Sequence, residues 1–149
     1  MRDDLPLEVT HEVRDRCLCL HLQRAARAVG RRFDEVLRPF NLTNGQYSLL
    51  VSLNRPHPPR ISDVATLLAM DRTTLTANLK PLERRGLLSI SADPKDKRGR
   101  LLHLTDAGRD LLVQAVPVWR ETHDEIDRVL GREDDEQLRS DLIDLTFRL

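Results

Sequence analysis

The sequence has few aromatic residues, few cysteines and no long apolar run. Aromatic side chains make up 3% of the 149 residues, so a core must consist mostly of leucine, valine and alanine. The two cysteines, Cys17 and Cys19, are too few for a disulfide framework. No apolar run approaches the roughly 18–20 residues that span a bilayer, and no secretory signal is visible. These absences favour a soluble cytoplasmic protein with no membrane partner.

The chain also lacks net charge, with 24 basic and 24 acidic side chains, but the charges are unevenly distributed. Residues 54–104 hold 10 basic and 5 acidic residues, whereas residues 105–149 hold 6 basic and 12 acidic ones. A basic centre indicates binding to a polyanion such as nucleic acid, although a solvated charged face has the same composition.

Sequence signatures of enzymes are missing. There is no phosphate-binding glycine loop, no paired zinc motif and no serine-hydrolase elbow. We therefore predict that the protein is not an enzyme and needs no cofactor. Cys17 and His21 stand four residues apart, which is half of a metal site, but no further ligand has positional support, so no metal is predicted.

Helical periodicity dominates the first third of the chain. Apolar residues recur every three or four positions over 11–39, which predicts one long helix that packs against another chain. Thr43 and Gln46 form a capping box at the start of a second helix. The apolar face of this second helix is predicted to include Tyr47, Leu50 and Val51, and three prolines at 56–59 then make a loop.

The C-terminal third is also helical. Thr105 caps a long helix that ends at Gly131, and an acidic turn at 133–136 begins the last helix. The inward face of the long helix is predicted to consist of Leu111, Leu112, Ala115, Trp119, Ile126 and Val129.

Between these helical parts lies a different pattern. Two short helices at 61–68 and 72–85 are followed by strands at 87–91 and 101–104, with a polar turn at 92–100. That order is a winged helix-turn-helix. The fold class is therefore mainly α with a small β-hairpin wing, together with a helical dimerisation region.

The second short helix has the surface of a DNA recognition helix. Its buried face is predicted to be Leu75, Leu79 and Leu82, and its opposite face has small or cationic side chains that allow close approach to base edges. The residues predicted to enter the major groove are Arg72, Thr73, Thr74, Thr76, Ala77 and Lys80.

The hairpin tip carries four cations in six residues, at 95–100. A projecting basic tip suits the narrow, electronegative minor groove of DNA, so Arg98 is predicted to enter it. Lys97 and Arg100 are predicted to contact phosphates. Asp93 and Asp96 are predicted to hold the arginines in place through ion pairs, with Asp96 orienting Arg98.

These motifs resemble those of the multiple-antibiotic-resistance regulator (MarR) family. The wing segments 93–98 and 102–108 carry the specific signature, and segments 42–47, 71–76 and 82–87 match the entry to the second helix and the recognition helix. The resemblance covers nearly the whole chain. It implies a homodimeric transcription regulator, usually a repressor, that binds double-stranded DNA at a pseudo-palindromic operator and is released by a small-molecule effector.

The resemblance also implies that residues 1–149 form a single domain whose segments have different roles. Segments 10–40 and 106–149 are expected to form the dimer interface, and segment 43–104 to bind DNA. The effector is expected between the dimer helices and the winged part. From the apolar stripes of the predicted helices, the following residues are expected to line its pocket: Phe33, Phe40, Tyr47 and Val51.

An alternative signal is oxidation of Cys19, whose register resembles the sensing cysteine of the family's organic-hydroperoxide branch. In that branch, tyrosine side chains usually hold the sensing thiol, but the corresponding residues here are Gln23 and Phe33, which have no phenol. No C-terminal cysteine is present either. Cys17, two residues away on the predicted long helix, faces too far from Cys19 to form a disulfide without unwinding. The competing interpretation of Cys19 is a small interface residue.

Two other binding functions remain open at this point. One is a nucleoid-type DNA-binding protein without a ligand, which sequence preference distinguishes from a regulator. The other is a winged-helix module that binds proteins, for which charge reversal at Arg98 and Lys80 would leave DNA affinity unchanged.

Overall fold

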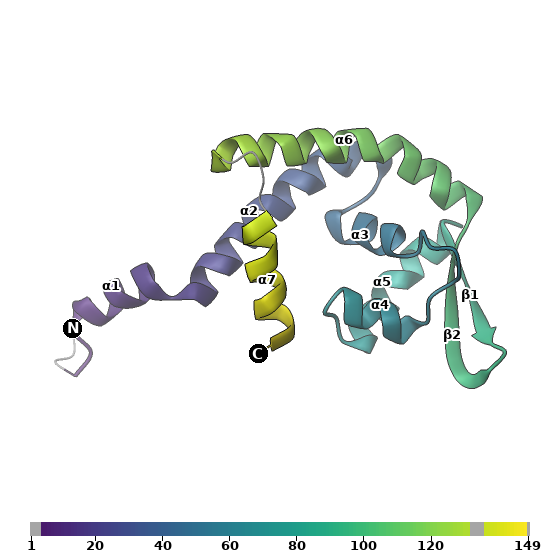
Figure 1. Ribbon diagram of the computed structural model, residues 1–149, viewed down its shortest axis with the longest axis horizontal. Coiled ribbons are helices and arrows are strands. Elements are labelled where there is room, and N and C mark those ends of the chain that lie inside the picture. Colours follow the sequence, from purple (N-terminus) through teal and green to yellow (C-terminus); the bar gives the residue numbers. More distant parts are fainter. Residues whose placement is uncertain (1–3, 132–135, 149) are drawn as a thin grey trace.

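The computed structural model describes residues 4–131 and 136–148 (Figure 1). It confirms a mainly helical fold with one two-stranded antiparallel hairpin. The elements in chain order are α1 (Leu7–Arg16), α2 (Leu18–Leu37), the 3-10 helix η1 (Arg38–Phe40), α3 (Asn44–Ser52), α4 (Ile61–Leu67), α5 (Arg72–Arg84), β1 (Leu88–Asp93), β2 (Asp96–Leu104), α6 (Asp106–Leu130) and α7 (Glu136–Arg148).

The prediction of one long helix over 11–39 is wrong, because the helix is interrupted at Cys17. Cys17 has an extended backbone (φ −73°, ψ 101°), and its Sγ accepts the N–H of Leu20 at 3.4 Å, so it caps α2. α1 has no buried residue, and therefore no packing holds it in line with α2. The two helices form an arm that extends away from the winged part (Figure 1).

The predicted helix starts are confirmed where a side chain caps the backbone. Thr43 Oγ1 accepts the N–H of Gln46 at 3.2 Å, and Gln46 Oε1 accepts the N–H of Thr43 at 3.0 Å. Thr105 caps α6 by accepting the N–H of Gly108 at 3.1 Å. The start of α7 lies beside residues 132–135, so the predicted acidic turn falls mostly outside the described residues.

The hairpin is longer than predicted. β1 and β2 pair from Leu88 opposite Leu104 as far as Asp93 opposite Asp96, so the turn is confined to residues 94–95. The polar turn predicted over 92–100 is wrong, because strand pairing satisfies the backbone of polar residues as well as that of apolar ones. Arg98 and Arg100 consequently lie on β2 rather than in a loop.

The core of the winged part is built mostly from leucine. Leu75, Leu79 and Leu82 of α5 are fully buried, as predicted. On the predicted apolar face of α3, Tyr47 and Leu50 are buried, whereas Val51 is 41% exposed. The buried leucines that complete this layer are Leu37, Leu42, Leu49, Leu53, Leu88 and Leu102.

α6 connects the winged part to the arm. It begins at the base of the hairpin and runs along α2 (Figure 1). Arg32 of α2 pairs with Glu125 of α6 at 2.7 Å, and this guanidinium holds the pKa of Glu125 below its usual range. The inward face of α6 is confirmed at Leu112 and Ala115, but Val129 is 82% exposed in the single chain.

Among the described helices, none has both the length and the apolar composition that crossing a membrane requires.

Candidate nucleic-acid interface and ligand pocket

The start of α5 is fixed by an aspartate cap. Asp71 Oδ1 accepts the N–H of Thr74 at 2.8 Å, and Asp71 Oδ2 accepts the hydroxyl of the same residue at 2.5 Å. The Thr74 hydroxyl is the main reason why the pKa of Asp71 is lowered. Thr74 was predicted to enter the major groove. Its hydroxyl instead donates its proton to Asp71 and stabilises the cap.

The outer face of α5 brings the other predicted groove residues together. They line a shallow groove of about 410 Å³, and all are exposed, whereas the leucines of the opposite face are buried. Thr76 donates its hydroxyl proton to the carbonyl of Arg72 at 2.7 Å, which leaves its methyl group and a lone pair for a partner. The residues of this groove are Arg72, Thr73, Thr76, Ala77 and Lys80.

Asp93 anchors the wing, but not through the partner that was predicted. Its side chain is almost fully buried, and Oδ2 pairs with Arg60 Nη2 at 2.7 Å. Oδ1 accepts the N–H of Lys95 at 2.8 Å across the turn. Arg60 precedes α4 and forms a β-bridge with Leu101, so the pair ties the wing to the segment before α4. Arg60 was not among the predicted site residues, because no local pattern marks it.

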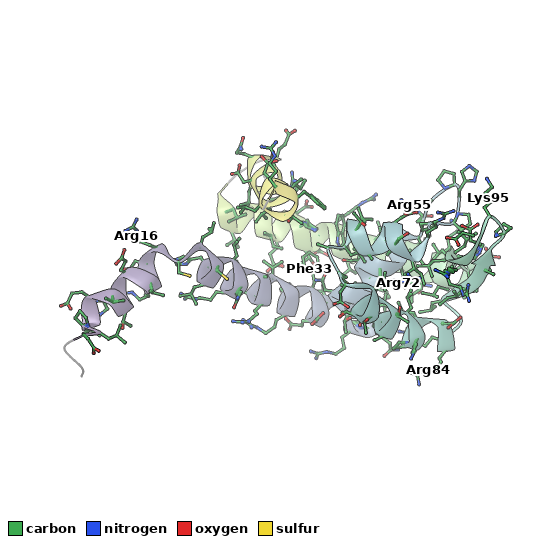
Figure 2. All side chains as sticks on the ribbon, turned by 90° about the horizontal axis from the view of Figure 1, so that it is seen from below. Arg16, Phe33, Arg55, Arg72, Arg84 and Lys95 are labelled. Atoms are coloured by element: carbon green, nitrogen blue, oxygen red, sulfur yellow. The ribbon has the colours of Figure 1, made fainter. Side chains whose placement is uncertain are left out.

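Asp96 shapes the backbone of the wing rather than the side chain of Arg98. Its Oδ1 accepts the backbone N–H of Arg98 at 2.9 Å, so the prediction that it orients the guanidinium is wrong. The Arg98 side chain is exposed. Arg100 donates from Nη1 to the carbonyl of Gly99 at 3.0 Å, and the side chain of Lys97 lies outside the described part of the structure. Arg72 on α5 and Lys95 at the hairpin turn both belong to the winged end, far from Arg16 in the arm (Figure 2).

The Asp93 anchor makes the wing sensitive to acid. The hydrogen bond from the backbone N–H of Lys95 lowers the pKa of Asp93, and the charge and hydrogen bond of Arg60 lower it further. A lowered pKa stabilises the fold above the ordinary carboxyl value of about 3.9, and this contribution is lost as the pH falls below it. We expect Asp93→Asn to unfold at lower urea concentration at pH 7 and to show a shallower loss of stability between about pH 5 and pH 2. Asp110→Asn, at an exposed carboxyl on α6, is the control and is expected to keep the wild-type profile. A wild-type profile in Asp93→Asn would contradict the anchor.

A second hollow, of about 300 Å³, lies between α3 and α6. Tyr47 and Val51 line it, in agreement with the predicted ligand pocket. Phe33 does not, because it is buried in the core with its ring 5.0 Å from that of His123. Phe40 lines a separate hollow beside Arg85. The remaining lining residues are Asn54, Arg109, Leu112, Val113, Val116, Trp119 and Arg120.

Most of this lining was missed from the sequence, although a signal was present. Tyr47 and Trp119 stack at 6.2 Å with an interplanar angle of 24°, which makes one aromatic wall. On the predicted helix that starts at Thr105, Arg109, Val116 and Arg120 fall on one face at helical spacing. That spacing would have indicated an apolar stripe bounded by two cations.

The two cysteines have different surroundings. Cys19 is exposed, and its Sγ accepts the side-chain amide of Gln23 at 3.2 Å. Cys17 occupies the break between α1 and α2, so the premise that both cysteines share one helix is wrong. Oxidation of Cys19 as a signal remains a prediction. His21 Nε2 lies 3.4 Å from the carbonyl of Asp15, and within residues 4–131 and 136–148 no three metal-ligating side chains cluster.

Apolar side chains stay exposed along the elements predicted to dimerise. They lie on the two helices of the arm, on α6 and on α7. The most exposed of them, each over half accessible, are Val13, Leu18, Val113, Val129, Ile143 and Phe147.

Comparisons with known proteins agree with this geometry. A MarR family profile matches residues 42–99. The HTH-type transcriptional regulator BilQ of Clostridioides difficile is 32% identical over 79 residues, which span 53% of this chain and about half the length of that relative. The M. tuberculosis transcriptional regulator MosR, solved in complex with DNA, has a TM-score of 0.78 and 36% identity, covering 87% of this chain and 93% of that one.

A third protein matches over still more of the chain. The transcriptional repressor CouR, solved bound to a 23-mer DNA duplex, has a TM-score of 0.80 and 32% identity, covering 95% of this chain and 97% of that one. Another structure of CouR holds p-coumaroyl-CoA. The winged hairpin, the capped recognition helix and these nearly full-length matches show that the chain belongs to the MarR family of winged helix-turn-helix transcription regulators.

Proposed function

We propose that this protein is a homodimeric, sequence-specific DNA-binding repressor that a small ligand releases from its operator. The observation that carries the proposal is the outer face of α5, where five side chains of the predicted DNA-facing set line one exposed groove. Because these side chains are short or cationic, the helix can approach base edges closely. A regulator with a chromosomal target acts in the cytoplasm, and no enzymatic step is needed.

In this proposal residues 43–104 bind DNA. α5 lies in the major groove, with Arg72 and the threonines at its start close to the bases. β1 and β2 project beyond α4 and α5 (Figure 1), so the wing reaches the neighbouring minor groove with Arg98. Lys80, Lys97 and Arg100 contact phosphates on either side.

Segments 10–40 and 106–149 form the dimer interface in this proposal. The exposed apolar side chains of the arm and of α7 need a cover, and a second copy of the chain supplies one. A two-fold axis between copies presents two α5 helices to one face of the duplex. The operator is then pseudo-palindromic, with half-sites separated by about one helical turn, roughly 34–36 Å.

The hollow between α3 and α6 is the proposed effector site. It is mostly apolar, it lies between the winged part and the long helix that reaches the arm, and it contains Tyr47 and Val51 as expected. CouR, a repressor similar over nearly its whole length, is known in a DNA-bound and in a ligand-bound form. A ligand that fits one arrangement of α3 against α6 better than another shifts the spacing of the two wings.

The test is a titration of the protein against DNA from upstream of its own gene and against a shuffled duplex, by fluorescence anisotropy. Sedimentation of the complex counts the chains on each duplex. We expect two chains per duplex and at least a 1,000-fold preference, on the order seen for specific regulators. Equal affinity for both duplexes would indicate a nucleoid-type binder, and no binding to either duplex would indicate a protein-binding module.

Lys80→Ala should weaken binding to every sequence by a similar factor. Lys80 is exposed at the edge of the α5 groove, where a phosphate contact releases counterions. We expect the slope of log affinity against log salt to become shallower by about one for each protomer. Lys80→Arg, which keeps the charge, should retain the wild-type slope. An unchanged slope in Lys80→Ala would remove this residue from the phosphate contacts.

A further inference from the structure

The hollow between α3 and α6 has a cation at each end of one helix face. Arg109, Val113, Val116 and Arg120 follow one another at intervals of four, three and four residues, so they form one stripe of α6. The two arginines are separated by about 16 Å along the helix axis. The residues between the two arginines on this face are apolar, so the stripe is apolar in the middle and positively charged at both ends.

Neither arginine is neutralised by a carboxylate in the described part of the chain. Arg109 donates from Nη1 to Oδ1 of Asn54 at 3.0 Å, which is an uncharged partner. Within residues 4–131 and 136–148, no carboxylate forms a salt bridge with Arg109 or Arg120. Cations beside an apolar hollow favour a ligand that brings its own negative charge.

A buried hydroxyl marks one end of the stripe. Tyr47 is only 4% exposed and lines the hollow, yet its hydroxyl has no hydrogen-bond partner among the described residues. Buried hydroxyl groups normally have a partner. Arg120 lines the same hollow as Tyr47. Burial raises the pKa of Tyr47, and the charge of Arg120 opposes this shift. A ligand acceptor at this end would satisfy both groups.

At the other end, Arg109 also belongs to a second, smaller hollow. Arg109 also lines a space of about 100 Å³ at the base of the hairpin, where Arg55 and His103 join it. Arg55 donates from Nε to the carbonyl of Ser52 at 2.9 Å, and its remaining donors have no partner in the described structure. The guanidinium of Arg109, which lines both hollows, suits an oxyanion such as a carboxylate or a phosphate.

We propose that the effector is an elongated, flat apolar molecule with an acidic group at each end. Arg120 and Tyr47 bind one acidic group, and Arg109 binds the other. The aromatic wall of Tyr47 and Trp119 contacts the flat middle of the molecule. This inference rests on the proposed function, in which the hollow is the effector site.

Three rigid probes test the two-ended site: biphenyl-4,4′-dicarboxylate, its monoacid biphenyl-4-carboxylate, and 4′-phosphonobiphenyl-4-carboxylate. Binding to the full chain is measured by calorimetry and by the fluorescence of Trp119, the only tryptophan in the sequence. We expect the diacid to bind about tenfold or more tightly than the monoacid, the gain of one charge-assisted contact. Tighter binding of the phosphonate than of the dicarboxylate would assign a phosphate to one end, and the reverse order a carboxylate.

The matched variants are Arg109→Gln and Arg120→Gln, with Arg31→Gln on the exposed face of α2 as the control. Each of the first two should reduce the affinity for the diacid to about that of the monoacid, and the control should leave it unchanged. Equal affinity of the unaltered protein for monoacid and diacid would overturn the inference without any variant. Operator binding by the ligand-free protein is measured in parallel: its absence would overturn the proposed function, whereas its presence with equal probe affinities would overturn only this inference.

Discussion

Arg98→Ala is expected to weaken operator binding by about 2–6 kcal/mol for each dimer, because each of the two wings loses one contact of about 1–3 kcal/mol. Arg98 lies on β2 with an exposed guanidinium, and its backbone N–H is held by Asp96. The wing itself is anchored by the buried pair of Asp93 and Arg60. The arginine is therefore presented on a fixed hairpin, so its loss removes a pre-organised contact.

The same substitution is expected to relax sequence selectivity. An arginine in a narrow minor groove senses the width of that groove, which depends on sequence. Lys95→Ala, at the turn of the same hairpin, is the control: it should weaken operator and shuffled DNA by a similar factor, because it removes only charge near the backbone. Equal losses on both duplexes in Arg98→Ala would contradict a minor-groove contact, and no loss at all would remove the wing from the interface.

Gly108→Ala is expected to lower the free energy of unfolding by about 3 kcal/mol. A Cβ at this position would lie 2.1 Å from the carbonyl oxygen of Leu87 and 2.8 Å from Cδ1 of Leu104. The first neighbour is backbone at the start of the hairpin, so it cannot rotate away. Relief requires α6 to move from the wing, and operator binding should fall as well.

Gly45→Ala is the matched control for this prediction. Gly45 lies in the first turn of α3, and a Cβ there would meet no atom within 4 Å. Alanine should leave stability unchanged or raise it by up to about 1 kcal/mol. Urea unfolding of both variants at matched protein concentration makes the comparison, since dimer stability depends on concentration. Equal unfolding midpoints would show that α6 does not pack on the hairpin as described.

Sequence patterns predicted the parts of the fold that depend on neighbouring residues. Thr43 and Thr105 cap the helices that they were predicted to cap, because each capping oxygen and the N–H that donates to it are three residues apart. The buried leucines of α5 followed from its period for the same reason. Because the leucines fix which face of α5 is buried, the five residues of the α5 groove lie together on the opposite face.

Features that depend on distant contacts were not predictable in this way. Asp93 was expected to hold an arginine of the wing, but its partner is Arg60, thirty-three residues earlier and brought near only by the β-bridge to Leu101. Phe33 shares a stripe with pocket candidates, yet packing against His123 places it in the core. The break at Cys17 was missed for another reason: its thiol caps α2 by accepting the N–H of Leu20, and cysteine is not among the residues that usually cap helices.

The central claim is that two copies of the α5 and wing surface bind one duplex. Hydroxyl-radical footprinting of the operator with wild-type protein and with Arg98→Ala tests it most directly. We expect two symmetric protected regions about one helical turn apart, with outer minor-groove protections that disappear only in Arg98→Ala. A single asymmetric footprint, or outer protections that persist without Arg98, would contradict it.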